Sequence, residues 1–158
     1  MAHGGILTVT NGGGMTKRLY VTAALFALFV TGGVAQTNAG KRTIRVDVNY
    51  TGSGVVDADH KIYVALWDTT DLQNAQPVAV QSLDSKKGTV TFSDVQKVPA
   101  YVSTAYDPTG AWAGKSAPPS GSSLGMYSKK IPTPEPIDVA PGKTVRVSLT
   151  FDDSVKVP

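Results

Sequence analysis

The chain has 158 residues and no cysteine, which fits one domain and excludes disulfide bonds, thiolate catalysis, cysteine-based zinc sites and a cysteine-linked lipid anchor. Its formal charge of +3 falls to +1 without Lys17 and Arg18, the two cations of a predicted export leader that contains no acidic residue. So small a charge gives no electrostatic basis for binding nucleic acid.

The N-terminal segment has the pattern of a bacterial secretory signal that begins at Met15. The basic pair Lys17-Arg18 precedes an apolar run from Leu19 to Val30, and small and polar residues follow. The run is shorter than the roughly 20 residues that a membrane-spanning helix needs. We therefore expect export without stable insertion in the membrane after cleavage.

This pattern divides the chain into three parts. We predict a misassigned N-terminal extension over 1–14, a signal peptide over 15–39 and one mature domain over 40–158. Cleavage after Ala35 or after Ala39 fits equally well. The mature domain is expected in the periplasm or outside the cell.

The first segment of the mature domain, Thr43 to Tyr50, alternates polar and apolar residues without a fault. The alternation places Ile44, Val46, Val48 and Tyr50 on one face, as in a half-buried β-strand. We also consider this strand as an exposed edge of its sheet.

The next segments also favour strands. Ile62 to Trp67 is apolar on both faces, which predicts a central strand or one covered by a loop. Alternation around Val78 to Gln81 resumes at Val90 to Phe92, after the turn-forming residues Ser85 to Gly88, and predicts a hairpin.

Two further strands are predicted at Tyr101 to Tyr106 and Thr144 to Phe151, and a short peripheral one at Ile137 to Val139, where neighbouring prolines limit pairing. No window after the leader has a helical period. The fold class expected is all-β, an antiparallel β-sandwich of about seven strands preceded by the signal peptide.

Several features in this order resemble the transthyretin-like (prealbumin-like) sandwiches, and among them the small secreted bacterial domains of uncharacterised function. The resemblance covers roughly Lys61 to Ser154. The features are Ile62 to Asp68, Val90 to Val95, Tyr101 to Gly110, a Pro/Gly-rich loop ending in Tyr127, and Val145 to Asp153. The resemblance implies a two-sheet sandwich and leaves the function open.

One enzyme branch of that group hydrolyses a purine-derived ring with several histidines, an arginine and a closing Tyr-Arg-Gly-Ser. The present chain closes with Phe151-Asp152-Asp153-Ser154 and keeps only His60 after export. We therefore do not expect that activity here.

The segment 107–130 is the strongest candidate for a binding site, because a connection of 24 residues rich in Gly, Pro and Ser is long for a compact β-domain. Its candidate binding residues are Trp112, Tyr127, Met126 and Asp107. Trp and Tyr combine a large apolar area with a polar tip, which suits a sugar ring or an apolar side chain. Alternatively, Trp112 and Tyr127 fold back to plug the end of the sandwich and to cover the apolar outer face of Tyr63, Ala65 and Trp67.

Aspartates offer a second candidate site. Asp57, Asp59, Asp152 and Asp153 supply the hard oxygen ligands that calcium prefers. With His60 as general base, such a cluster would make a divalent-metal-dependent hydrolase. We hold this as an alternative, and we expect no other cofactor.

The function predicted is that of an exported, monomeric or weakly associating, non-catalytic binding or structural module of the bacterial envelope. Its partner would be an envelope protein or a polysaccharide, recognised through residues 107–130. A third alternative is assembly into fibres or matrix by strand addition at an exposed edge such as Thr43 to Tyr50.

Overall fold

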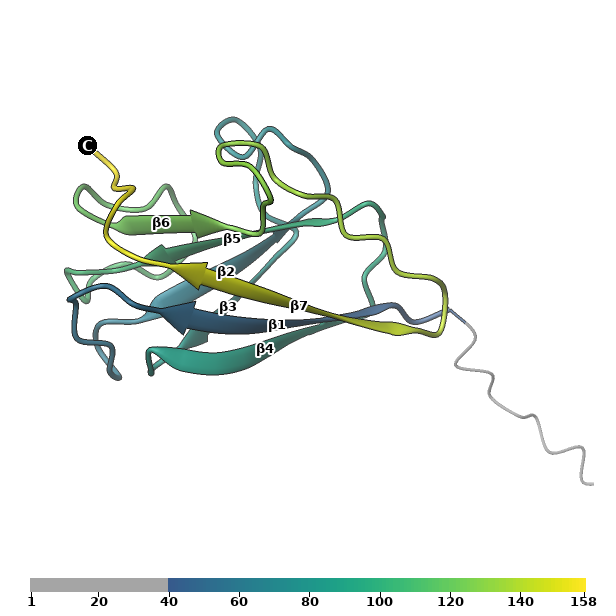
Figure 1. Ribbon diagram of the computed structural model, residues 1–158, viewed down its shortest axis with the longest axis horizontal. Coiled ribbons are helices and arrows are strands. Elements are labelled where there is room, and N and C mark those ends of the chain that lie inside the picture. Colours follow the sequence, from purple (N-terminus) through teal and green to yellow (C-terminus); the bar gives the residue numbers. More distant parts are fainter. Residues whose placement is uncertain (1–39) are drawn as a thin grey trace, which may run out of the picture. The chain divides into compact units, whose positions relative to one another are not determined.

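A computed structural model describes residues 40–158, and within them the chain forms seven β-strands in two sheets (Figure 1). Sheet A has the order β4-β1-β7 and sheet B the order β3-β2-β5-β6. The strands are β1 (Thr43–Tyr50), β2 (Ile62–Trp67), β3 (Ala79–Leu83), β4 (Lys87–Ser93), β5 (Tyr101–Tyr106), β6 (Ser123–Met126) and β7 (Thr144–Phe151). The predicted all-β domain of about seven strands in two sheets is confirmed. The expectation that all strands pair in antiparallel orientation is wrong, because β1 and β7 pair in parallel.

The predictions for residues 1–14 and 15–39 lie outside the described residues. In the part that the structure describes, residues 40–158, there is no helix that could cross a bilayer.

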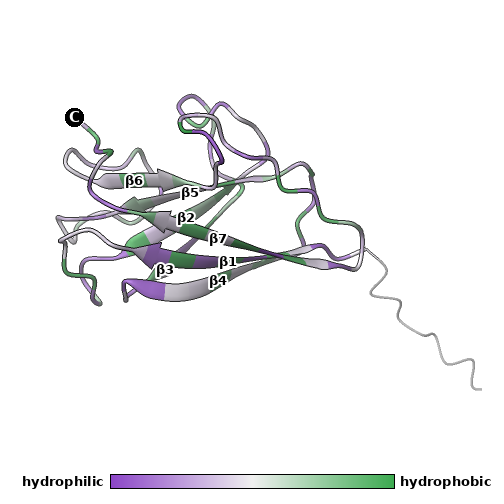
Figure 2. Cartoon of the chain, viewed as in Figure 1, coloured by the Kyte–Doolittle hydropathy of each residue, from purple (hydrophilic) through white to green (hydrophobic). Residues whose placement is uncertain are grey.

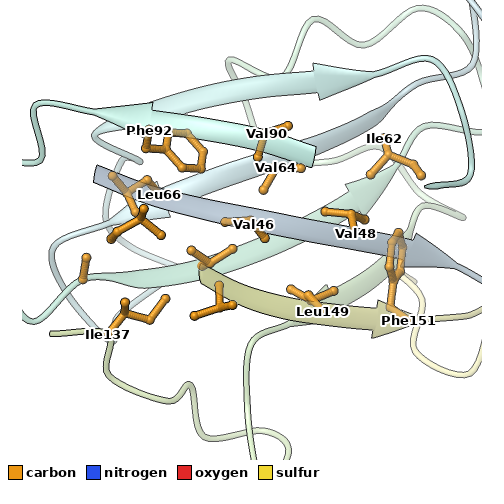
Figure 3. Packing of buried hydrophobic residues seen from close by; sticks show 14 of the residues in the cluster. Val46, Val48, Ile62, Val64, Leu66, Val90, Phe92, Ile137, Leu149 and Phe151 are labelled. Atoms are coloured by element: carbon orange, nitrogen blue, oxygen red, sulfur yellow. The ribbon is translucent and has the colours of Figure 1, made fainter. Parts of the chain in front are cut away.

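The core lies between the two sheets and is built from the inward positions of each strand. On β1, Ile44, Val46, Val48 and Tyr50 are all buried, with exposed fractions between 0% and 3%. Figure 2 shows hydrophilic and hydrophobic residues alternating along β1. In Figure 3, side chains from β1, β2, β4 and β7 meet in one layer. Period-2 patterning therefore sets the buried face, as predicted.

β1 is the central strand of sheet A, and the expectation of an exposed edge at Thr43 to Tyr50 is wrong. It pairs in antiparallel orientation with β4 over seven of its residues and in parallel orientation with β7 over all eight. The alternation in β1 determines which face is buried but carries no information on its neighbours, because backbone hydrogen bonds are common to all residues. Assembly through this strand is therefore excluded.

The predicted hairpin between β3 and β4 is also wrong, because the turn between them carries the chain from sheet B to sheet A. The Gln81 side chain spans the gap: its Nε2 donates to the Thr91 carbonyl at 2.5 Å, and the Thr91 amide donates to its Oε1 at 3.4 Å. Both Thr91 groups point away from β1, so this amide caps the free edge of β4. A crossing between sheets and a hairpin have the same alternation, so the pattern could not distinguish them.

A strand that the sequence did not predict, β6, lies inside the 107–130 connection. It pairs with β5, and the chain after β7 pairs with it in turn, through Leu124 N to Val155 O at 2.8 Å and Val157 N to Ser122 O at 2.9 Å. Gly125 hid the strand from a propensity-based reading. A Cβ there would lie 2.6 Å from the Phe151 Cβ, so packing requires the glycine.

The predicted peripheral strand at Ile137 to Val139 is reduced to one bridge between Ile137 and Ala100. Ile137 and Val139 are nevertheless buried, with exposed fractions of 2% and 3%. This segment therefore belongs to the core.

Candidate functional site

The loop 107–122 is held by a buried carboxylate at its first residue. The Asp107 side chain is 0% exposed, and its Oδ1 accepts hydrogen bonds from the Thr109 amide at 2.8 Å and the Thr109 hydroxyl at 2.7 Å. Its Oδ2 accepts the Trp112 amide at 2.9 Å. Burial acts to raise the pKa of Asp107, but these hydrogen bonds outweigh it and hold the pKa below its ordinary value. The ionised carboxylate thus sets the conformation of the loop.

Trp112 is held over β2 by contacts along its whole length. Its indole ring packs edge-on against the Tyr63 ring, with ring centroids 4.6 Å apart. The Tyr63 hydroxyl donates to the Trp112 carbonyl at 2.5 Å, and the indole Nε1 donates to the carbonyl and hydroxyl of Ser116, both at 3.2 Å. The ring is half-buried and its orientation is determined before any ligand binds.

Gly114 lets the same loop lie close against sheet B. Its φ is +73°, and a Cβ there would lie 2.5 Å from Cδ1 of Tyr63 and 3.2 Å from Cγ1 of Val80. Only glycine satisfies both the left-handed backbone and this contact. The loop therefore covers the outer face of sheet B over Tyr63 and Val80.

The rest of that outer face is uncharged and rich in aromatic side chains. The Trp67 indole lies there and donates to the Ser103 hydroxyl at 2.9 Å, and Tyr101 is its partner on β5. Trp67 and Trp112 are the two tryptophans of the chain, and both lie on this face. The outward residues of sheet B are Tyr63, Ala65, Trp67, Val80, Ser82, Tyr101, Ser103, Ala105, Leu124 and Met126.

The four predicted binding residues take different places. Trp112 and Met126 lie on the outer face of sheet B, whereas Asp107 is buried as the anchor of the loop. Tyr127 packs against the hydrophobic core, and its amide donates to the Val102 carbonyl at 2.9 Å. In the alternative in which the two rings fold back, Trp112 does cover Tyr63 of β2, whereas Tyr127 packs against the core and not over β2.

Sequence reasoning missed Tyr101 and Gly114 as parts of this face. Tyr101 joins it because the register pairs Tyr101 with Trp67. The left-handed φ of Gly114 is compatible with its position in a Gly-rich loop, but its contact with Tyr63 follows only from the loop's path. The signal available in the sequence was the apolar character of both faces of β2.

Asp153 belongs to a different cluster, where it joins the two sheets. Its Oδ1 accepts the Tyr50 hydroxyl of sheet A at 2.5 Å and the Ser123 hydroxyl of sheet B at 2.7 Å. Its Oδ2 accepts the amide and hydroxyl of Ser53, both at 2.8 Å. The hydrogen bond from Tyr50, followed by those from Ser123 and Ser53, holds the pKa of Asp153 well below its ordinary value. This arrangement is that of a structural latch.

Of the remaining candidate aspartates, Asp57 and Asp152 stabilise turns and Asp59 is exposed. Oδ1 of Asp57 accepts the amides of His60 at 2.8 Å and Asp59 at 3.0 Å and lies 3.0 Å from Nδ1 of His60. The hydrogen bonds from His60, first its amide and then its side chain, lower the pKa of Asp57. Asp152 caps the next turn through the Ser154 amide at 2.9 Å. Within residues 40–158, no three or more acidic or histidine side chains converge on a point where a metal ion could bind.

A shallow groove opens at the opposite end of sheet B from Trp112. It consists of two adjoining hollows of about 160 and 230 Å³ that share Leu66, Val78, Val95 and Gln96 in their walls. Lys97 and Asp68 form an ion pair of 2.7 Å at its rim.

No family model, curated protein or solved structure matches the chain. The resemblance to transthyretin-like domains therefore stays a prediction.

Proposed function

We propose that the chain is an exported, non-catalytic binding or structural module of the bacterial envelope. It recognises an envelope protein or polysaccharide through the 107–122 loop and the adjoining outer face of sheet B. The observation that carries this proposal is the half-exposed Trp112 ring, held in one orientation by the buried Asp107 carboxylate and by Tyr63.

A preorganised aromatic ring is effective in recognition for two reasons. It contributes a large apolar area, and little conformational freedom is lost when the ligand binds. Trp112 has partners for its amide, its carbonyl and its indole N–H, so the ring needs no rearrangement.

The non-catalytic part of the proposal is supported by what the carboxylates do. Both oxygens of Asp107 and both oxygens of Asp153 accept hydrogen bonds from within the protein. Asp57 likewise caps the turn that contains His60. Export and a periplasmic or secreted location rest on the Met15 leader.

The experiment is a thermal-shift screen of the full-length protein against envelope polysaccharides, neutral and acidic, and against calcium. A ligand that binds only the folded state at about 100 times its Kd stabilises it by about 2.7 kcal/mol, so the midpoint rises. The shift should disappear in Trp112→Ala and persist in Thr150→Ala, an exposed position on sheet A.

A shift that survives in Trp112→Ala would refute recognition through this loop. A shift with calcium alone would contradict the proposal and favour the alternative of a divalent-metal-dependent hydrolase at the aspartate-rich end of the sandwich.

A further inference from the structure

The outer face of sheet B selects against charged ligands. None of its ten outward strand positions within residues 40–158 carries a charge. At the end where β5 begins, two nearby cations are paired: Lys97 with Asp68 at 2.7 Å and Lys129 with Glu135 at 2.5 Å. A charged ligand lying on the strands would lose hydration without gaining a partner of opposite charge.

The aromatic rings on this face fall into two groups at opposite ends of β2. Trp112 and Tyr63 form one group, and Trp67 with its register partner Tyr101 forms the other. Tyr63 and Trp67 are four residues apart on one strand, a separation of about 13 Å. Ala65 lies between them on β2, and its small side chain projects less from the sheet than the two aromatic rings do.

In the second group, Tyr101 is the ring that a ligand can contact. The Trp67 side chain is 9% exposed and forms the floor, whereas Tyr101 is half-buried and more accessible. Hydroxyl groups accompany the rings, because Tyr101 and Ser103 both point outward from β5. Rings with neighbouring hydroxyls match a pyranose, which has an apolar face of C–H groups and a rim of hydroxyls.

From these observations we infer that the ligand is an uncharged glycan chain that lies along β2 and contacts both aromatic groups. This inference rests on the proposed function and gives it a chemical class. The distance between the groups requires several sugar units, so a single sugar would reach only one of them.

Trp67 and Trp112 are the two tryptophans of the chain, so intrinsic tryptophan fluorescence reports binding at the outer face of sheet B. We would titrate the full-length protein with the hexaoses and disaccharides of cellulose, xylan and mannan, and with hexagalacturonate as the acidic probe, and follow tryptophan fluorescence. At least one neutral hexaose should change the fluorescence and bind about tenfold more tightly than its disaccharide, because it reaches both groups. Raising the salt from about 0.05 M to about 0.5 M should leave its Kd unchanged.

Variants separate the two aromatic groups from the charges nearby. Tyr101→Ala should weaken binding of that hexaose by about tenfold or more, whereas Tyr101→Phe keeps the ring and most of the affinity. Thr150→Ala should bind like the wild type, because Thr150 is exposed on sheet A, away from the loop and from the outer face of sheet B. Lys115→Ala removes an exposed cation of the loop and is the probe for charge-dependent binding. Circular dichroism and the thermal midpoint verify that each variant is folded.

The outcomes distinguish the inference from the proposed function. Binding of hexagalacturonate that is weakened by Lys115→Ala, or Trp112-dependent binding of a protein without any neutral glycan, would overturn the inference and leave the function standing. If Tyr101→Ala bound the neutral glycan as tightly as the wild type, the second aromatic group would have no part in binding and the inference would be overturned. No fluorescence change and no thermal shift with any polysaccharide or envelope protein would overturn both.

Discussion

The outer faces of the two sheets differ in chemistry although their inner faces are alike. On sheet A every outward position bears a hydroxyl, an amide or a charge, and Asp47 pairs with Arg146 there in the open. On sheet B the outward positions are apolar, aromatic or small, and a loop lies across part of them. The outward residues of sheet A are Thr43, Arg45, Asp47, Asn49, Lys87, Thr89, Thr91, Ser93, Thr144, Arg146, Ser148 and Thr150.

This difference shows how a solvated face and a recognition face are built from the same strand geometry. Sheet A keeps strict alternation, as expected where one face is in water. Sheet B abandons it on β2, where Tyr63 and Trp67 point outward and are shielded in part by the loop or by neighbouring strands. Apolar residues at outward positions of a strand therefore indicate that another segment or a ligand covers that face of the sheet.

The largest expected effect comes from removing Asp107, the carboxylate that anchors the loop over sheet B. Asp107→Ala should lower the free energy of unfolding by about 3 kcal/mol, because the Thr109 and Trp112 amides lose a charged acceptor in a buried place. Urea denaturation followed by tryptophan fluorescence measures it. Asp47→Ala on sheet A is the control and should leave the midpoint nearly unchanged, since exposed ion pairs contribute little. Equal losses in both variants would refute the anchoring role.

The next largest effect is expected where the loop touches the sheet. Gly114→Ala should cost about 2 kcal/mol more than Gly142→Ala, because its Cβ would overlap the Tyr63 ring. Both glycines are left-handed, with φ of +73° and +74°, but a Cβ at Gly142 would meet nothing within 4 Å. The pair isolates the close contact from the backbone strain. Identical unfolding midpoints in the two variants would show that the loop lifts easily from sheet B.

Acid should weaken the latch that joins the sheets. The folded protein holds the pKa of Asp153 below that of the unfolded chain, so this stabilisation is complete above about pH 4 and is lost as the pH falls below it. At pH 7, Asp153→Asn should lower the free energy of unfolding by about 1.5 kcal/mol. Thermal midpoints of wild type and variant should converge between about pH 4 and pH 2. A gap that stays constant through this range would mean that ionisation of Asp153 plays no part.

The smallest effect tests the uncharged character of the face directly. Ala65→Lys should cost about 1 kcal/mol, because a half-buried outward position on β2 must then solvate a charge. The matched change Thr89→Lys lies on the exposed face of sheet A and should be close to neutral. Chemical denaturation of the two variants provides the comparison. If Thr89→Lys were the more destabilising, the contrast between the faces would be mistaken.

Much of the fold could be predicted because the signals are local. The alternation in β1 and β7 determined their buried faces, and the structure confirms Ile44, Val46 and Leu149 in the core. The missed strand β6 and the false hairpin share one cause. Gly125 is required by packing against Phe151, and the turn after β3 leads into sheet A. Both depend on residues far away in the sequence, which a local pattern does not contain.

The candidate site was predictable in part. Trp112 could be singled out as an aromatic residue in a long Gly/Pro-rich connection, and its contact with β2 was foreseen as an alternative. Tyr101 could not, since its place beside Trp67 depends on the register between β2 and β5. The roles of Asp107 and Asp153 as anchors likewise depend on which donors the fold brings to them.

The sequence by itself determined the all-β class, the strand faces that are buried and the residues able to make a binding loop, because side-chain period and turn chemistry act over a few residues. Only the tertiary structure decided that β1 is central, that β7 lies parallel to it and that the Trp112 loop covers sheet B. These features rest on backbone pairing and close packing between segments far apart in the chain. Such contacts become specific only when the whole core has formed.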